Sequence, residues 1–442
     1  MRITLLSSLA LLAACETAAE ISPTPAFSTS IEEEAAPSDF ETFDLQDVRL
    51  EVLDIAYRFI AVDLGDGAAD EAVIEDAREL QIRFAHALAA SATFDELEAT
   101  GETVEIQWLG VGLLSDDLED ASLADQDVPD SPTIEDVAGA VEWVGFNPGS
   151  RNEFMLRMPL QMSALIGAEG VLRGVPDGSE SLDGEGPVLT SQVGNADTRV
   201  LKGSKNTAQT ATNFKRIVSF TTGCTGTLVG RHHVLSAGHC IRRTAKNGNP
   251  ASWSQPELRV GRNGTDWIAS ADTSTGWRWF WVEASYYTAS NNGSSPRSTD
   301  FGLIITPSRH IGSSTGWFGW QYSNSEHDDM YNRGYPGTPP LANHSRHLFG
   351  DSNNCKTGDY SSSKDSYNYR LFGYHSCDTS GGHSGSALYR KNGSAWVVRG
   401  VHKGATNPGV TNGSSNSTLW NSFALVTRER SAQISAFRAS YP

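Results

Sequence analysis

The second half of this 442-residue chain consists of short runs of β-favouring residues, and that pattern limits the folds open to it. Between Val193 and Thr427 the runs are separated by frequent Gly, Asn and Ser, which favour turns. Many short strands joined by turns are typical of paired β-barrels. We therefore expect two all-β barrels here, followed by a short helix over residues 431–437.

A serine flanked by glycines stands late in this half, between Cys377 and the apolar run 387–389. Two glycines before Ser384 and one after it let the backbone bend sharply, so that the hydroxyl projects while nearby N–H groups turn toward one point. Gly- and Ser-rich turns are common in this chain, and a serine needs a base and an orienting acid before it can attack a carbonyl. The motif therefore predicts a nucleophile only if both partners are present.

His239 is the candidate base. It follows the apolar run 234–235 and three small residues that leave room for the imidazole. Cys224 and Cys240 bracket this strand and loop, so a disulfide between them would fix the histidine in place.

Asp300 is the candidate acid, because it stands directly before the apolar run 301–305. A lone carboxylate is costly at the start of a buried strand, and an imidazole partner would offset that cost. Asp266 and Asp272 are rivals in the same interval, but each has a polar setting with no apolar strand after it.

The chain order His239, Asp300, Ser384 resembles that of the chymotrypsin-like serine endopeptidases. Three further blocks resemble their bacterial glutamyl-endopeptidase branch, the V8-like and Bacillus-type enzymes. These blocks are Thr315–Trp320, Gly334–Gly337 and Gly400–His402. The resemblance covers about residues 193 to 442, and it departs from the family at His383, where relatives usually carry Asn, Gln or Asp.

This resemblance implies a chymotrypsin-like double β-barrel and a Ser-His-Asp triad with no metal or organic cofactor. The N–H groups of Gly382 and Ser384 would form the oxyanion hole. An esterase with the same triad would usually have the serine first in the chain. A catalytically inactive binding protein on the same fold is a further alternative, against which the complete triad argues.

Substrate preference has two interpretations. Thr379 and His402 match the positions where glutamyl endopeptidases place the hydroxyl and imidazole that bind a substrate carboxylate, which predicts cleavage after Glu. Both side chains can donate a hydrogen bond to an anion, and Lys403 adds positive charge.

Asp378 stands six residues before the nucleophile, where trypsin-type enzymes keep the acid that binds Arg or Lys. A trypsin-like preference is therefore the alternative, and the role of Asp378 stays open.

The two halves of the chain carry opposite charge. Residues 16–200 contain 40 Asp and Glu against 8 Arg and no Lys, whereas residues 201–442 contain 13 acidic against 25 basic residues. This contrast suggests that an acidic prodomain clasps a basic catalytic domain and inhibits it within the same chain. The basic residues are scattered rather than clustered, so nucleic acid is not an expected partner, whereas protein and peptide substrates are.

The N-terminus is typical of an export signal, with Arg2 followed by an apolar run that ends at Ala14. The segment Leu12–Cys15 resembles the bacterial lipobox, in which Cys15 is lipidated and gives the protein its only contact with the membrane. An ordinary signal with a chance cysteine is the alternative. We expect a cell-envelope lipoprotein as the precursor and a periplasmic or secreted enzyme after maturation.

Four cysteines remain after Cys15, an even number that suits an oxidising compartment. Of the three possible pairings we expect the local one, which joins Cys224 to Cys240 and Cys355 to Cys377.

We divide the chain into five segments. They are residues 1–15, a signal with lipobox; 16–40, a flexible tether; 41–180, a small acidic α+β prodomain; 181–192, a cleavable linker; and 193–442, the protease domain. Within the prodomain, apolar periodicity predicts helices over residues 48–60 and 73–88, and strands over 104–109 and 153–158. Cleavage would free an amine near Val193, which the resemblance places near the substrate carboxylate.

Overall fold

A computed structural model describes twelve stretches of the chain, in which the fold and the candidate site can be followed. They are residues 56–65, 70–91, 93–115, 140–162, 199–201, 214–272, 279–306, 311–337, 346–351, 354–393, 395–405 and 421–442. The predicted signal, tether and linker lie outside them, as do Cys15 and Val193. No helix among the described residues is long and apolar enough to cross a membrane.

The region predicted to be a prodomain contains a four-stranded sheet with helices beside it. The strands, in spatial order, are β1 (Ile60–Asp63), β2 (Val104–Val111), β4 (Asn152–Pro159) and β3 (Ala140–Phe146). Helix α2 (Glu71–Ser91) buries an apolar face that includes Leu80, Phe84 and Leu88. Helix α3 (Phe94–Thr100) begins at a capping box between Thr93 and Glu96.

The structure agrees with three of the four predicted prodomain elements. Helix α2 and strands β2 and β4 lie where the periodicity placed them. The helix predicted over residues 48–60 is wrong at its end, because Ile60 begins β1 and pairs in parallel with Val104. Residues 48–55 lie outside the described part of the chain.

The first barrel sheet carries the candidate base and acid. Its strands, in spatial order, are β13 (Trp279–Glu283), β14 (Gly302–Ile305), β8 (His233–Ser236), β7 (Thr225–Leu228), β6 (Ile217–Phe220), β11 (Leu258–Val260) and β12 (Ala269–Ala271). Short elements flank it. They are the 3-10 turn η3 (Phe214–Arg216), α6 (Gly238–Ile241), β9 (Arg242–Arg243), β10 (Ser252–Trp253) and α7 (Ala284–Asn291).

Six strands close the second barrel, since β20 pairs with β16 at one end of the row and with β21 at the other. In ring order they are β20 (Ala387–Asn392), β21 (Ala395–Ala405), β22 (Asn421–Leu425), β19 (Phe372–His375), β18 (Cys355–Tyr360) and β16 (Asp329–Gly334). Three short strands add to its edges, namely β15 (Gly319–Trp320), β17 (Phe349–Asp351) and β5 (Arg199–Leu201). The chain ends in α8 (Arg428–Ser440), which confirms the helix predicted there.

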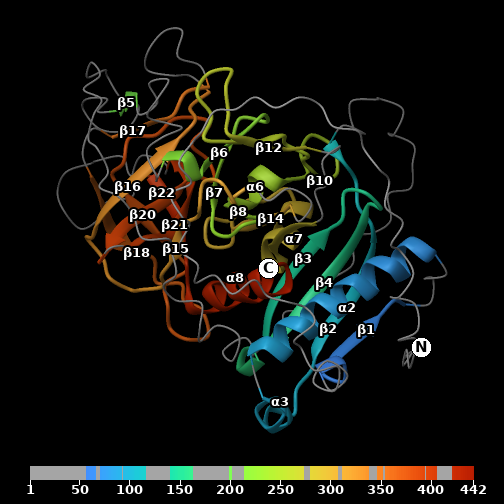
Figure 1. The fold of residues 1–442 in the computed structure, drawn as a ribbon. Helices are drawn as coiled ribbons and strands as arrows, with labels where there is room; N and C mark the ends of the chain where they lie inside the picture. Colours follow the sequence, from blue (N-terminus) through green and yellow to red (C-terminus); the bar gives the residue numbers. More distant parts are fainter. Residues whose placement is uncertain are drawn as a thin grey trace, which may run out of the picture.

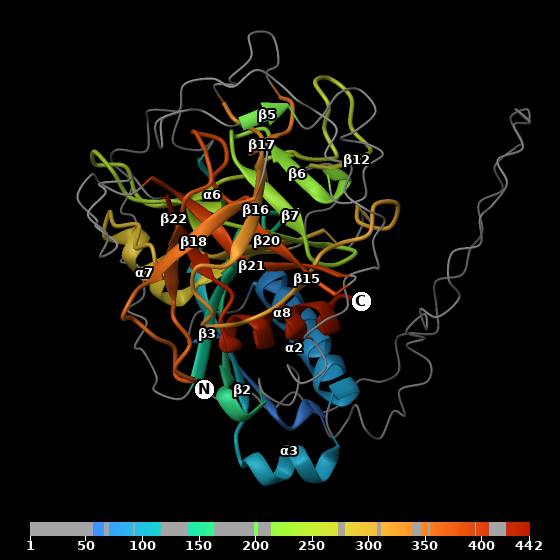
Figure 2. The same ribbon diagram turned by 90° about the vertical axis from the view of Figure 1, so that its left-hand side faces the viewer.

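The four-stranded sheet of the N-terminal half and the first barrel sheet form one continuous sheet. Strand β3 pairs antiparallel with β13, so that Phe146 stands opposite Phe280. Helix α2 lies against α8 (Figures 1 and 2). The Phe84 and Phe437 rings meet there edge to face at 5.8 Å. The described contacts between the halves are thus sheet pairing and aromatic packing, in addition to charge.

One buried acid of strand β4 contacts the barrel domain. Glu153 accepts hydrogen bonds from Arg242 (3.2 Å), Trp253 (2.5 Å) and Tyr287 (2.5 Å). The Arg242 guanidinium also lies over the Tyr287 ring, 4.1 Å from its centroid. A carboxylate in this position is compensated by a cation and two neutral donors.

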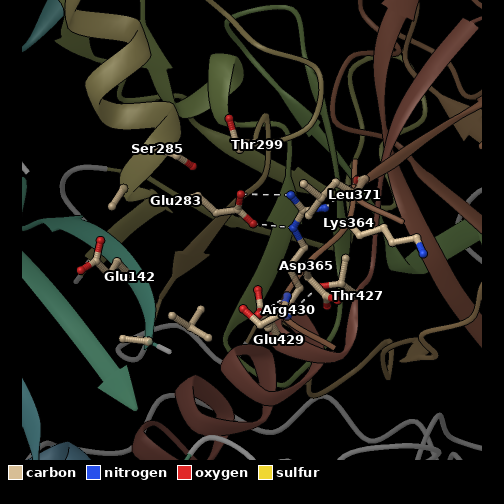
Figure 3. A pocket seen from close by; sticks show the side chains of 14 residues that line it. Glu142, Glu283, Ser285, Thr299, Lys364, Asp365, Leu371, Thr427, Glu429 and Arg430 are labelled. Carbon is tan, nitrogen blue, oxygen red and sulfur yellow. Dashed lines mark hydrogen bonds and ion pairs between the residues drawn. The ribbon is translucent and has the colours of Figure 1, made fainter. Parts of the chain in front are cut away.

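A polar cavity of about 360 Å³ lies at the same junction, between β3, the start of α7 and the start of α8 (Figure 3). Arg430 crosses it and forms a two-point ion pair with Glu283, with one contact at 3.0 Å. Arg430 also donates to the Ser298 carbonyl oxygen, and it lies 4.7 Å above the Phe301 ring. The C-terminal helix therefore supports the turn that carries Asp300.

Candidate active site

His239 lies in the single turn of α6, directly after strand β8. Cys240 forms a disulfide with Cys224 in the turn before β7, with the two Cα atoms 6.0 Å apart. This covalent link ties the α6 turn to the neighbouring strand, so the imidazole stands on a fixed backbone. The second expected disulfide, between Cys355 and Cys377, is also formed.

Of the three candidate acids Asp266, Asp272 and Asp300, the one that contacts the His239 imidazole is Asp300. Strand β14 pairs with β8, so that Gly302 stands opposite Ser236 and the residues before and after these strands come together. Asp300 is fully buried. Its Oδ2 lies 2.8 Å from His239 Nδ1, and its Oδ1 accepts the His239 backbone N–H at 2.8 Å.

The electrostatics favour an ionised Asp300. Burial acts to raise the pKa of this carboxyl, but His239 and Lys403 outweigh burial and leave the pKa below its usual value. Two hydrogen bonds to its oxygens also hold the carboxylate in one orientation, which in turn fixes the ring of His239.

The Ser384 turn is held by strand β7. The Thr225 amide donates to the Ser384 carbonyl oxygen and the Thr225 hydroxyl donates to the Gly382 carbonyl oxygen, both at 2.8 Å. Gly382 has φ +103°, and a Cβ there would lie 2.4 Å from the Tyr335 carbonyl oxygen, so only glycine fits. In the structure the Ser384 hydroxyl donates to the Lys403 carbonyl oxygen at 3.3 Å.

Two amides in this turn are available to an incoming oxygen. In the described part of the chain, the backbone N–H groups of Gly382 and Ser384 donate to no backbone carbonyl. Their neighbours are engaged, since His383 donates to Ser380 and Gly385 donates to His402. The turn thus leaves free the pair of donors that an oxyanion hole requires.

His402 and Thr379, the two residues expected to bind substrate, are both buried. His402 lies on β21, and its Nδ1 is 2.9 Å from Nε2 of His375 on β19. Burial lowers the pKa of His402 well below its ordinary value, and His375, His383 and His239 lower it further. Burial, helped by His383, lowers the pKa of His375 to about 3. Both imidazoles are therefore neutral near pH 7.

Sequence reasoning missed His375, and no local motif marks it, because its contact lies 27 residues further along the chain. Lys403 does not point toward His402, since its ammonium contacts Asp300 and Ser295. Asp378 is buried, and its backbone N–H donates to the Asp351 carboxylate at 3.1 Å.

Comparison with known proteins agrees with this geometry. The family profile described as Trypsin matches residues 202–421. The chain contains a chymotrypsin-like domain of the trypsin family, and this domain is a serine endopeptidase domain. It is similar to the glutamyl endopeptidase of Bacillus licheniformis, at 28% identity over 247 residues that span 54% of this chain and 67% of the relative.

Two solved structures align with the chain at lower identity. A structure titled Glu endopeptidase in complex with MPD aligns at 22% identity with a TM-score of 0.42, covering 56% of this chain and 99% of the other. The protease Anisep from Arthrobacter nicotinovorans aligns at 18% identity with a TM-score of 0.32, covering 47% of this chain and 89% of the other.

Proposed function

We propose that this chain is an exported serine endopeptidase zymogen in which His239, Asp300 and Ser384 form the triad, with a preference for Glu at the residue before the cut. Two observations carry the proposal: the fixed His239–Asp300 pair, and a serine turn with two free amides. Lys403 contacts both, since its ammonium lies near Asp300 and its carbonyl oxygen accepts the Ser384 hydroxyl. Within the described part of this turn, Ser384 is the serine whose hydroxyl stands beside the two amides without a backbone acceptor.

The reaction follows from these positions. The Ser384 hydroxyl rotates from the Lys403 carbonyl oxygen toward His239 Nε2, loses its proton to that nitrogen and forms a bond to the substrate carbonyl carbon. The amides of Gly382 and Ser384 stabilise the resulting oxyanion. His239 then gives the proton to the leaving amine, and a water molecule, deprotonated by the same nitrogen, releases the acid product.

The preference for Glu rests on His402. If His375 donates from Nε2 to Nδ1 of His402, then His402 carries its own proton on Nε2 and can donate it to a substrate carboxylate. Thr379 supplies a hydroxyl donor five residues before the nucleophile. The glutamyl endopeptidase relative supports this preference. The alternative is a trypsin-like preference through Asp378.

We extend the proposal to maturation. The prodomain inhibits the enzyme until the linker 181–192 is cut and an amine near Val193 is freed. Cys15 carries a lipid on the precursor. The acidic charge of residues 16–200 and the sheet pairing of β3 with β13 support a firmly attached prodomain.

A library of peptides that varies the residue before the cut tests the substrate class. We expect cleavage after Glu, loss of this cleavage in His402→Ala, and retention of fluorophosphonate labelling at Ser384 in that variant. Dominant cleavage after Arg or Lys, lost in Asp378→Ala, would establish the trypsin-like alternative. A wild-type chain that takes no label would indicate an inactive binding protein.

Maturation needs its own experiment. Ser384→Ala should abolish hydrolysis, and it should accumulate as the full-length chain if the linker is cut by the enzyme itself. Normal processing of this variant would assign the cut to another protease. Mass spectrometry of membrane and secreted fractions would show whether Cys15 is acylated.

A further inference from the structure

The ammonium of Lys403 lies beside the acid of the proposed triad. Its Nζ is 3.7 Å from Asp300 Oδ2, the same oxygen that His239 Nδ1 contacts at 2.8 Å. Nζ also donates to the carbonyl oxygen of Ser295 and lies 3.2 Å from its hydroxyl. Only 17% of the Lys403 side chain is exposed, so its charge is held near the carboxylate rather than in solvent.

Other ionisable groups surround this pair. Tyr286 of α7 faces Asp300, and mainly burial, with help from that carboxylate, raises its pKa, so it stays neutral. Glu283 at the end of β13 also faces Asp300 but is paired with Arg430.

Two more groups act on the cations. Arg297 repels Lys403, and His402, which is neutral, faces His239. Burial lowers the pKa of Lys403 and Asp300 acts to raise it. The carboxylate of Asp300 is thus shared between a fixed ammonium and the imidazole of His239.

Sharing the carboxylate changes the protonation of the base. In a Ser-His-Asp triad the acid stabilises the imidazolium form of the histidine. A second cation on the same oxygen opposes that form, because like charges repel strongly across a partly buried site. The free enzyme needs an unprotonated histidine, because His239 must accept the proton of Ser384.

We propose that Lys403 is a positioning residue that acts through Asp300 to keep His239 unprotonated at mildly acidic pH. This inference rests on the proposed triad. It assigns Lys403 to the base and not to the pocket for the substrate carboxylate. The acid side of the pH profile of kcat/KM should therefore depend on the charge at position 403.

The test compares pH profiles of the processed enzyme on one Glu-containing peptide. Lys403→Met should move the midpoint of the acid side of the profile upward by about one pH unit, an order-of-magnitude shift for one nearby charge. Lys403→Arg should restore the wild-type midpoint. Lys391→Met is the matched control. Lys391 of β20 lies over the ring of Trp396 of β21, 6.0 Å from its centroid, so this variant should keep the wild-type profile.

Lys403→Gln is a second neutral variant. Where hydrolysis is too weak to measure, the pH dependence of fluorophosphonate labelling replaces the pH profile of kcat/KM. An active Lys403→Met enzyme with an unmoved midpoint would overturn the proposal. It would also be overturned if both neutral variants keep the wild-type circular dichroism spectrum but neither label nor hydrolyse at any pH. A wild-type chain that neither labels nor cleaves peptide would instead overturn the triad itself.

Discussion

Glu153 should be the most sensitive single residue at the junction of the two halves. It is 6% exposed and its partner Arg242 is 3% exposed, so the ion pair is buried. Glu153→Ala removes the acceptor of three hydrogen bonds and leaves the Arg242 guanidinium buried without this counter-charge. Loss of one member of a buried pair typically destabilises a protein by about 3 to 5 kcal/mol.

The assay is urea unfolding of the full-length protein, monitored by tryptophan fluorescence. The protein carries Ser384→Ala, which prevents self-cleavage. Glu105→Ala is the matched control within the prodomain, because Glu105 pairs with Arg157 at 2.7 Å but is 48% exposed. An exposed pair contributes about 0 to 1 kcal/mol. We expect Glu153→Ala to lower the free energy of unfolding several times more than the control does.

A double variant separates the buried charge from the lost packing. Glu153→Leu combined with Arg242→Met replaces both charges with apolar groups, and it should recover most of the stability lost in Glu153→Ala. Equal destabilisation by Glu153→Ala and Glu105→Ala would refute the reasoning. So would a double variant that is no more stable than Glu153→Ala alone.

Three further predictions concern the catalytic domain. Gly382→Ala should lower kcat by about 10² or more, because the Cβ of the new alanine would meet the Tyr335 carbonyl oxygen and displace a proposed oxyanion donor. Steady-state kinetics test this prediction, and a wild-type kcat would contradict it. The unfolded chain protonates His375 near pH 6.5 but the folded chain only near pH 3, so the free energy of unfolding should fall as the pH drops below about 6.5. Urea unfolding midpoints at pH 7.5 and 4.5 measure this fall. Equal midpoints would count against a neutral buried imidazole. Arg430→Met should lower kcat through the Ser298 turn before the catalytic acid; an unchanged kcat in a folded variant would show that this turn needs no support from α8.

The residues of the proposed triad could be found from sequence because each has a local cue. His239 is bracketed by cysteines, Asp300 precedes an apolar run, and Ser384 has glycines around it. His375 has no such cue, since its importance comes from a contact between β19 and β21 that only the closed barrel creates. A residue defined by a long-range contact is not visible to a pattern search.

The same contrast holds for the prodomain. Helix α2 was predictable because one face is buried and the other is solvated, which gives a helical period. Strand β3 was missed because it lies between β4 and β13 and its last four residues are all buried, so the alternation stops after its first half. The helical pattern ending at Ile60 failed for a related reason, since pairing with β2 overrode it.

The sheet shared by the two halves has a consequence for release. If the prodomain left after the linker was cut, β13 would become an edge strand that carries Trp279, Phe280 and Trp281 in an unpaired row. Exposed apolar edges of this kind promote aggregation. We therefore expect the nicked protein to remain a two-chain particle, which copurification of both fragments would show and loss of the acidic fragment would contradict. In such a particle, a lipid on Cys15 would hold the protease at the membrane after cleavage through the strand pairing, ring packing and buried ion pair of the junction. Secretion of the mature enzyme would then require the acidic fragment to dissociate.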